Sequence, residues 1–204
     1  MKAMPQQSAL DGFFIPEPAV PTDRLFFAIL PDPGPATAAK IGAFTQQLSH
    51  DHCLRGRPLL ADRLHITLHH LGDYAGVPDG LIDRACQAVA QISAASFEVT
   101  FDRAMSFAGR PRNRPFVMRG NERQNGGLAA LMVFQKTMYH AMCRAGLQGP
   151  RANAKFAPHV TLMYDDQGIT EQAVEPINWL AHDFVLIRSL LGQTKHIHLG
   201  RWPA

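Results

Sequence analysis

The stretch Leu64-His65-Ile66-Thr67-Leu68 returns in nearly the same form later in the chain, as Pro158-His159-Val160-Thr161-Leu162. Both copies lie in short apolar runs of the kind that form β-strands. Because successive side chains of a strand point to opposite faces, each copy places its His and Thr on one face and its aliphatic residues on the other. Two such strands across a groove would therefore present two imidazoles and two hydroxyls to one small ligand.

This set of side chains suits a phosphodiester anion. Hydroxyl groups and protonated imidazoles donate hydrogen bonds to phosphate oxygens. An unperturbed imidazole titrates near a pH of about 6.5, so one His can accept a proton while the other donates one at either end of an in-line displacement. We expect His65 and His159 to be catalytic, and Thr67 and Thr161 to hold the non-bridging oxygens. The pattern leaves open which His is the acid and which is the base.

The chain resembles the two-histidine (2H) phosphoesterases, specifically the bacterial branch called RNA 2′,3′-cyclic phosphodiesterase or 2′-5′ RNA ligase. The resemblance is carried by an opening strand at 24–29, the first motif with its Leu-Gly-Asp ending at 64–73, and the second motif at 156–162. It implies hydrolysis of 2′,3′-cyclic phosphates at RNA ends or in small cyclic nucleotides to 2′-phosphates, and reversible 2′-5′ ligation, with no metal and no cofactor. Many relatives carry a basic residue shortly after the second motif, whereas this chain has Tyr164 in that region.

Strand-like and helix-like patterns are mixed along the chain. Alternating or wholly apolar runs predict strands at 25–30, 97–102, 115–119, 184–190 and 195–199 besides the two motifs, and apolar residues at helical spacing predict helices near 37–48, 82–92 and 128–142. Short turns between strands favour antiparallel pairing and an α+β fold. The resemblance implies two pseudo-symmetric lobes, each a small antiparallel sheet with outer helices, and an active-site groove between them.

Composition limits the remaining choices. The 204 residues carry a net charge of +3, which permits RNA ends or cyclic nucleotides as partners without requiring them. The proline-containing residues 1–23 are expected to form a flexible lead-in, and residues 24–204 one domain. Three widely spaced Cys, no signal peptide and no membrane-length apolar run indicate a cytoplasmic protein, which we expect to be a monomer.

Several further residues are candidates for substrate contact. Residues 103–119 contain five Arg and no acidic residue, so Arg110 and Arg112 are expected to contact RNA phosphates, although the segment could equally be a solvated basic loop. Phe107 and Phe156 could stack on a base or lie in the core. If the first motif strand is regular, His69 shares a face with His65. The spacing His196-x-His198 could hold a metal, but no Cys or acidic pair has matching spacing.

Two alternative functions remain. One is cleavage of another diester, such as a 2′-5′ linkage or an ADP-ribose cyclic phosphate. The other is a non-catalytic module that binds nucleotide or RNA in the same groove, although binding alone would not need two titrating groups. The sequence has no P-loop, dinucleotide-binding glycine motif or Gly-x-Ser-x-Gly, so an ATP-driven ligase is not supported.

Overall fold

The computed structural model describes residues 19–31, 35–92, 94–108, 112–120, 126–149 and 156–204. Within these residues the strands are β1 (Asp23–Ile29), β2 (Ile66–Tyr74), β3 (Phe97–Ser106), β4 (Arg114–Arg119), β5 (His159–Asp165), β6 (Gln172–Ala181), β7 (Asp183–Leu190) and β8 (Lys195–Pro203). The helices are α1 (Pro35–Asp51), α2 (Leu81–Val89), α3 (Gly126–Arg144) and the short 3-10 helix η1 (Ala61–Arg63).

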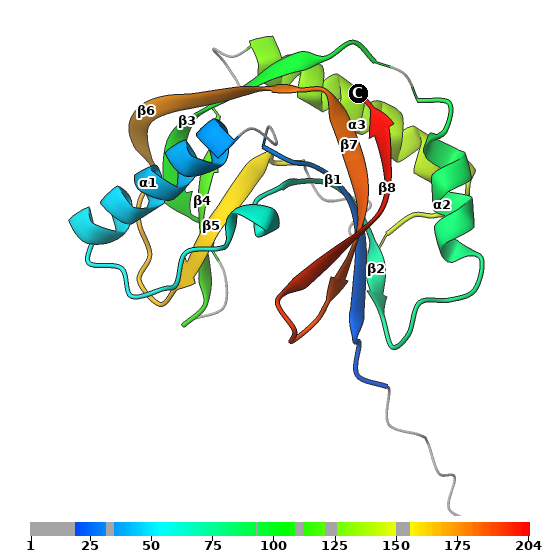
Figure 1. Cartoon of the computed structure of the whole chain (residues 1–204), viewed down its shortest axis with the longest axis horizontal. Coiled ribbons are helices and arrows are strands. Elements are labelled where there is room, and N and C mark those ends of the chain that lie inside the picture. Colours follow the sequence, from blue (N-terminus) through cyan, green and yellow to red (C-terminus); the bar gives the residue numbers. More distant parts are fainter. Residues whose placement is uncertain (1–18, 32–34, 93, 109–111, 121–125, 150–155) are drawn as a thin grey trace, which may run out of the picture.

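The strands form one antiparallel sheet that is nearly divided at its centre. Their order is β6-β3-β4-β5-β2-β1-β7-β8, and β5 and β2 are paired only at Val160 and Ile66. Strands β2, β1, β7 and β8 therefore form a first half, and strands β5, β4, β3 and β6 form a second half. The two halves diverge from this junction (Figure 1). The predicted α+β class and antiparallel pairing are confirmed, and each half carries one copy of the motif.

The two halves interleave along the chain. The first half takes β1 and β2 from the beginning and β7 and β8 from the end, while the second half consists of β3 to β6. Helix α1 follows β1 in sequence but packs beside β6 in the other half, whereas α3 packs against β2, β3 and α2 (Figure 1). None of the helices in the described part of the chain is both long and apolar enough to cross a membrane.

The segment between α1 and β2 returns along β5 and positions the first motif. The Asp165 carboxylate accepts hydrogen bonds of 2.6 Å from the backbone N–H groups of Arg55 and Gly56, and the N–H of Leu59 donates to the Leu162 carbonyl at 2.7 Å. A Cβ at Gly56 would lie 2.1 Å from the Tyr164 carbonyl oxygen, so this close approach requires glycine. The second motif strand therefore holds the residues that lead into the first.

Strand β1 is buried on both faces. Leu25, Phe27 and Ile29 belong to the main core under the helices. Phe26 and Ala28 face the other way and form a small separate cluster with Val185 and Ile187 of β7. This small cluster lies behind His65, because the rings of Phe26 and His65 are 4.8 Å apart. The wholly apolar composition of the strand thus supports the core and the groove wall at once.

Strand β6 is absent from the sequence-based prediction. Its second part alternates as a strand should, with Ile177, Trp179 and Ala181 buried, but Pro176 lies inside it. A proline lacks the N–H that a central strand needs, so a proline within a run argues against a strand. The segment can tolerate it because β6 is an edge strand that pairs only with β3.

The boundary of the expected lead-in falls slightly earlier than predicted. Residues 1–18 lie outside the described residues, and residues 19–22 lead into β1. Asp23 is already the first residue of β1, where its buried carboxylate accepts a 2.6 Å hydrogen bond from Nε of Arg188. Residue 23 therefore belongs to the folded domain.

Candidate active site

The two motif copies meet where the halves of the sheet join. Ile66 and Val160 are partners in the antiparallel pairing of β2 and β5, and both are fully buried. Continuing that register by one residue in each direction places His65 level with Thr161, and Thr67 level with His159. The four polar side chains therefore share the face opposite the aliphatic pair. The arrangement has an approximate twofold symmetry centred between the halves.

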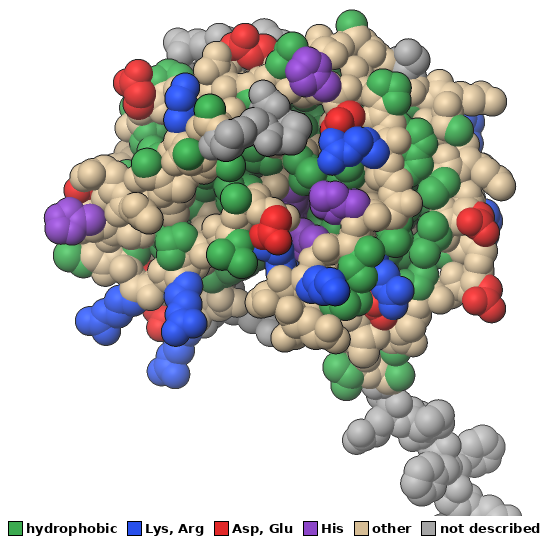
Figure 2. Space-filling model, in the orientation of Figure 1, with side chains coloured by type: hydrophobic (Ala, Val, Ile, Leu, Met, Phe, Trp, Pro, Cys, Tyr) green, Lys and Arg blue, Asp and Glu red, His purple; other side chains and the backbone are tan. Residues whose placement is uncertain are grey.

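A cavity of about 220 Å³ opens on this face. Polar and aromatic side chains from both halves and from η1 line it: Arg24, Phe26, Leu59, Arg63, His65, Thr67, His70, Thr161, Tyr164, Ser189 and His196. In the space-filling view, histidine side chains gather in the hollow between the two halves with Lys and Arg side chains beside them (Figure 2). The hollow is therefore a polar, cationic site of a size suited to a small anionic ligand.

The two motif histidines are held in the same way. Nδ1 of His65 donates to the carbonyl oxygen of Arg63 at 2.7 Å, and Nδ1 of His159 donates to that of Ala157 at 2.7 Å. In each copy the acceptor lies two residues before the His. Because a carbonyl oxygen can only accept, each ring carries its proton on Nδ1 when neutral and offers Nε2 to a ligand. Both imidazoles are thus fixed in one tautomer.

Burial keeps both rings uncharged in the free protein. Burial, together with smaller repulsion from His159 and Arg63, outweighs the effect of the carbonyl hydrogen bond and lowers the pKa of His65 to about 4. Burial also lowers the pKa of His159, with Arg119 adding repulsion. At neutral pH both Nε2 atoms therefore present lone pairs, and a bound anion would favour protonation of one of them.

Because β2 contains a bulge, His69 does not lie on the face that a regular strand would give it. Phe27 pairs with His69 and Ala28 with Thr67, so Leu68 is an extra residue that reverses the alternation of the strand. His69 is consequently buried on the helix side, where Nε2 donates to the Leu147 carbonyl at 3.1 Å. The expectation that His69 shares a face with His65 is wrong, and His70 lines the cavity instead.

The second copy has a bulge at the equivalent place. Phe116 pairs with Met163 and Val117 with Thr161, so Leu162 is the extra residue in β5. Tyr164, which a regular strand would turn away from His159, therefore lines the cavity. His70 and Tyr164 each lie five residues after a motif His. In the second copy the consecutive apolar residues Leu162 and Met163 are a signal in the sequence that could have indicated the bulge, whereas in the first copy Leu68 is followed by the polar His69.

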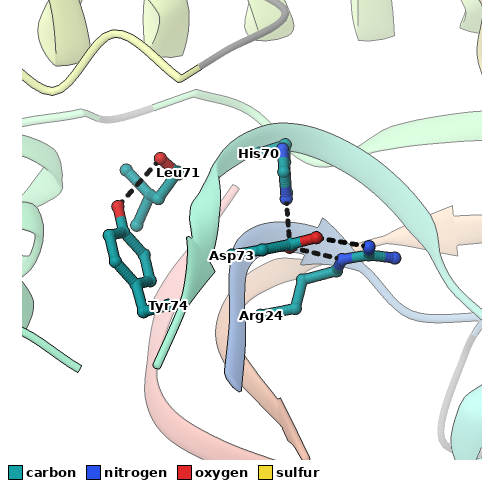
Figure 3. Close-up of polar contacts among 5 residues, drawn as sticks. All are labelled: Arg24, His70, Leu71, Asp73 and Tyr74. Atoms are coloured by element: carbon teal, nitrogen blue, oxygen red, sulfur yellow. Dashed lines mark hydrogen bonds and ion pairs between the residues drawn. The ribbon is translucent and has the colours of Figure 1, made fainter. Parts of the chain in front are cut away.

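His70 belongs to a polar group on the rim of the first half. Its Nε2 donates to Oδ1 of Asp73 at 3.0 Å, and Arg24 holds the same carboxylate with two hydrogen bonds of 2.7 Å (Figure 3). The Arg24 hydrogen bonds outweigh partial burial and lower the pKa of Asp73 to about 2. The bidentate contact fixes the guanidinium of Arg24 at the edge of the cavity.

The wall behind His65 contains a residue to which the sequence assigned no role in substrate binding. His196 of β8 lies edge-on to His65, with ring centroids 5.4 Å apart, and contacts Phe26 at 5.7 Å. Within the described residues, no group of three or more His, Cys, Asp or Glu could hold a metal ion. The pair His196 and His198 thus lacks further ligands there. His196 instead belongs to the cavity around His65.

The other sequence candidates lie in the second half or on its surface. Phe107 packs edge-on against His159, with ring centroids 4.7 Å apart. Phe156 is half-buried against the main core. Arg112 is exposed in the connection between β3 and β4 and is not among the described residues that line the cavity. Arg110 lies outside the described residues.

Comparisons with known proteins agree with this geometry. A family model described as LigT-like phosphoesterase matches residues 32–117, which include the first motif. No match was found among curated proteins. The structure of E. coli LigT complexed with 3′-AMP has 26% identity and a TM-score of 0.66, and covers 90% of this chain and 98% of that one.

Two further solved structures are similar to this chain. LigT from E. coli in its apo form has 25% identity and a TM-score of 0.65 at the same coverage. TT0787 of Thermus thermophilus, at 18% identity, has a TM-score of 0.66 over 88% of this chain and 97% of that one, which concerns the fold alone. The chain is thus similar to E. coli LigT over 90% of its length, and the model of the LigT-like phosphoesterases matches residues 32–117, in agreement with the two His-x-Thr strands at the junction of the two halves.

Proposed function

We propose that this protein hydrolyses 2′,3′-cyclic phosphates, at RNA ends or in small cyclic nucleotides, to 2′-phosphates. The observation that carries the proposal is the pair of histidines whose Nδ1 atoms are both held by a carbonyl two residues earlier. Two imidazoles with free Nε2 atoms on one face can act at opposite ends of an in-line displacement at phosphorus. A site for binding alone would gain little from two neutral, buried bases.

In the proposed reaction, a water oxygen attacks phosphorus as the bond to the 3′ oxygen breaks. Nε2 of one His takes the proton from the water, and the other His, protonated when the anion binds, gives a proton to the departing 3′ oxygen. The hydroxyls of Thr67 and Thr161 donate hydrogen bonds to the two non-bridging oxygens and stabilise the charge that develops there. In ligation a 5′ hydroxyl takes the place of water: its oxygen attacks phosphorus of the 2′,3′-cyclic phosphate, the bond to the 3′ oxygen breaks, that oxygen takes up a proton, and a 2′-5′ linkage forms without a nucleotide cofactor.

Nucleotide complexes of a relative support a nucleotide as ligand. E. coli LigT has been solved with 3′-AMP, with NADP+ and with ATP. In this chain we propose that Phe107, which packs against His159, presents an aromatic surface beside the reacting phosphate. Arg110 and Arg112 are proposed to contact phosphates of a longer RNA.

The test is hydrolysis of a short RNA that ends in a 2′,3′-cyclic phosphate, with EDTA present. We expect wild type to give a 2′-phosphate end, and His65→Ala and His159→Ala each to lower kcat by about 10²- to 10⁴-fold. His140→Ala is the matched control, because His140 is exposed on α3, which packs on the helix side of the sheet where His69 is buried.

Three results would contradict the proposal. Turnover that survives both His→Ala changes would remove the two histidines from the mechanism. Absence of wild-type turnover together with cleavage of a 2′-5′ linkage or an ADP-ribose cyclic phosphate would move the activity to another diester. Tight binding of the RNA with no turnover of any of these diesters would indicate a binding module.

A further inference from the structure

Two buried polar atoms beside His65 lack hydrogen-bond partners among the described residues. They are Nε of Arg63 and Nδ1 of His196, and both residues line the cavity that contains His65; Nδ1 of His70, which also lines this cavity, is a third buried atom without a partner. A buried donor left unpaired typically costs more than an ordinary hydrogen bond gains, so native proteins rarely keep two such atoms in one place. Their position at the wall of one cavity indicates that a ligand satisfies them.

The positive charge of Arg63 favours an anionic ligand beside Arg63 and His196. No carboxylate of the described residues forms an ion pair with Arg63, whereas Arg24 at the same cavity is held by Asp73. Burial, followed by repulsion from Arg63 and His65, lowers the pKa of His196 to about 3. At neutral pH the His196 ring is therefore uncharged and Arg63 carries the positive charge of this wall, so an entering anion would pair with Arg63 and favour protonation of His196.

The position of His196 distinguishes it from residues that would contact the reacting phosphate. A phosphate that both catalytic histidines can reach must lie at the junction of β2 and β5. His196 approaches His65 from β8, which lies three strands from β2 and away from β5. Ser189 of β7 pairs with His196 in the sheet and also lines the cavity, so its hydroxyl adds a donor on this side. Ser189 and His196 thus come from the strands of the first half, and Arg63 of η1 lines the same cavity two residues before His65.

We propose that Arg63, His196 and Ser189 form a second anion subsite, which binds the phosphate on the 5′ side of the nucleoside whose 2′,3′-cyclic phosphate is opened. The inference rests on the proposed function. It implies that the preferred substrate is an RNA end or a 5′-phosphorylated nucleotide, and not a nucleoside that carries the cyclic phosphate alone. Arg63 supplies the fixed positive charge, and His196 supplies a donor whose protonation follows the anion.

The test compares adenosine 2′,3′-cyclic phosphate with the same compound bearing a 5′-phosphate. For wild type we expect kcat/KM to be about tenfold or more higher for the 5′-phosphorylated substrate, the scale of one charge-assisted hydrogen bond. Arg63→Gln should reduce that ratio to near one, His196→Gln should reduce it partly, and Arg63→Lys should restore part of it. Arg84→Gln, an exposed change on α2, is the control and should leave the ratio unchanged.

Two results would overturn the subsite. One is a wild-type ratio near one, and the other is an Arg63→Gln enzyme that is slower on both substrates but keeps the wild-type ratio, which would place Arg63 on the reacting phosphate. If wild type turns over neither these nucleotides nor the short RNA with a 2′,3′-cyclic phosphate end, the proposed function fails. The subsite is then judged by calorimetry, where wild type should bind adenosine 2′,5′-bisphosphate more tightly than 2′-AMP and Arg63→Gln should not. Equal affinities for wild type would refute the subsite independently of catalysis.

Discussion

The burial of His65 predicts a specific loss of stability in mild acid. In the folded protein the pKa of His65 is lowered to about 4, while in the unfolded chain the imidazole has its ordinary value of about 6.5. As the pH falls below about 6.5, the His65 imidazole binds a proton in the unfolded chain but not in the folded protein. Stability attributable to this residue is therefore complete above that pH and declines until the folded ring is itself protonated near pH 4.

The magnitude follows from the two pKa values. Each pH unit between them corresponds to about 1.4 kcal/mol, so the loss between pH 7 and pH 5 is about 2 kcal/mol for this one residue. His65→Gln removes the titrating group and keeps a side-chain N–H that can donate to the Arg63 carbonyl. Between pH 7 and pH 5, the free energy of unfolding should therefore decrease less in the variant than in wild type, by about 2 kcal/mol.

Urea unfolding at pH 7 and pH 5, followed by circular dichroism, measures this difference directly. His140→Gln serves as the control, because His140 is exposed and should leave the pH dependence of wild type unchanged. The reasoning would be refuted if wild type and His65→Gln lost equal stability between the two pH values. Such a result would mean that the His65 ring is hydrated in the folded protein and is not held as a neutral base.

Two further predictions concern the ligand. Thr67→Val and Thr161→Val should each lower kcat by about 10²-fold, the effect of removing one donor to a developing oxyanion, with the urea midpoint little changed; an unchanged rate would remove the hydroxyl from the mechanism. Arg112→Ala should weaken binding of a longer RNA and reduce the salt dependence of its affinity by about one released counterion, as a log–log plot of Kd against salt would show. A salt slope equal to that of wild type would leave Arg112 as a solvated surface residue.

Local patterns predicted most of the secondary structure, because helix and strand periodicity and helix ends depend on residues that are close in the sequence. The helix predicted near 128–142 is an example: it is followed by Gly146, which adopts a φ of 68°, and the N–H of Leu147 donates to the Met142 carbonyl at 2.8 Å, as a glycine-terminated helix requires. Strand β6 was not predicted, because it contains Pro176, and a proline is tolerated in a strand only at the edge of a sheet. Whether a strand lies at an edge is decided by the order of strands, which no local pattern contains.

The same limit applies to the site. The motifs predicted which four side chains meet, but two facts about the wall depend on tertiary structure. The bulge at Leu68 reverses the faces of His69 and His70, and an extra residue in a strand is fixed by its partner strand. His196 reaches His65 because β8 joins the first half through β7, although the two residues are far apart in the chain. From the sequence, His196 could be identified as a candidate residue, but not as part of the cavity wall beside His65.

The duplication extends further than the motif itself. Both strands carry a bulge directly after the His-x-Thr, and in both the residue five positions after the His turns back into the cavity: His70 in the first copy and Tyr164 in the second. The arrangement of the two motif copies is therefore symmetric, whereas the residues at its two ends differ. His70 is tied to a carboxylate shared with Arg24, and Tyr164 is an exposed phenol.

This division assigns different tasks to the two sets of residues. A symmetric pair of His and Thr can open a cyclic phosphate or close one, because each His can serve as acid in one direction and as base in the other. It cannot by itself orient an asymmetric nucleotide. Orientation must come from the unequal surroundings, with Arg63 and His196 beside His65 and Phe107 beside His159. An anion on the first side and a base on the second would fix which His faces the leaving oxygen.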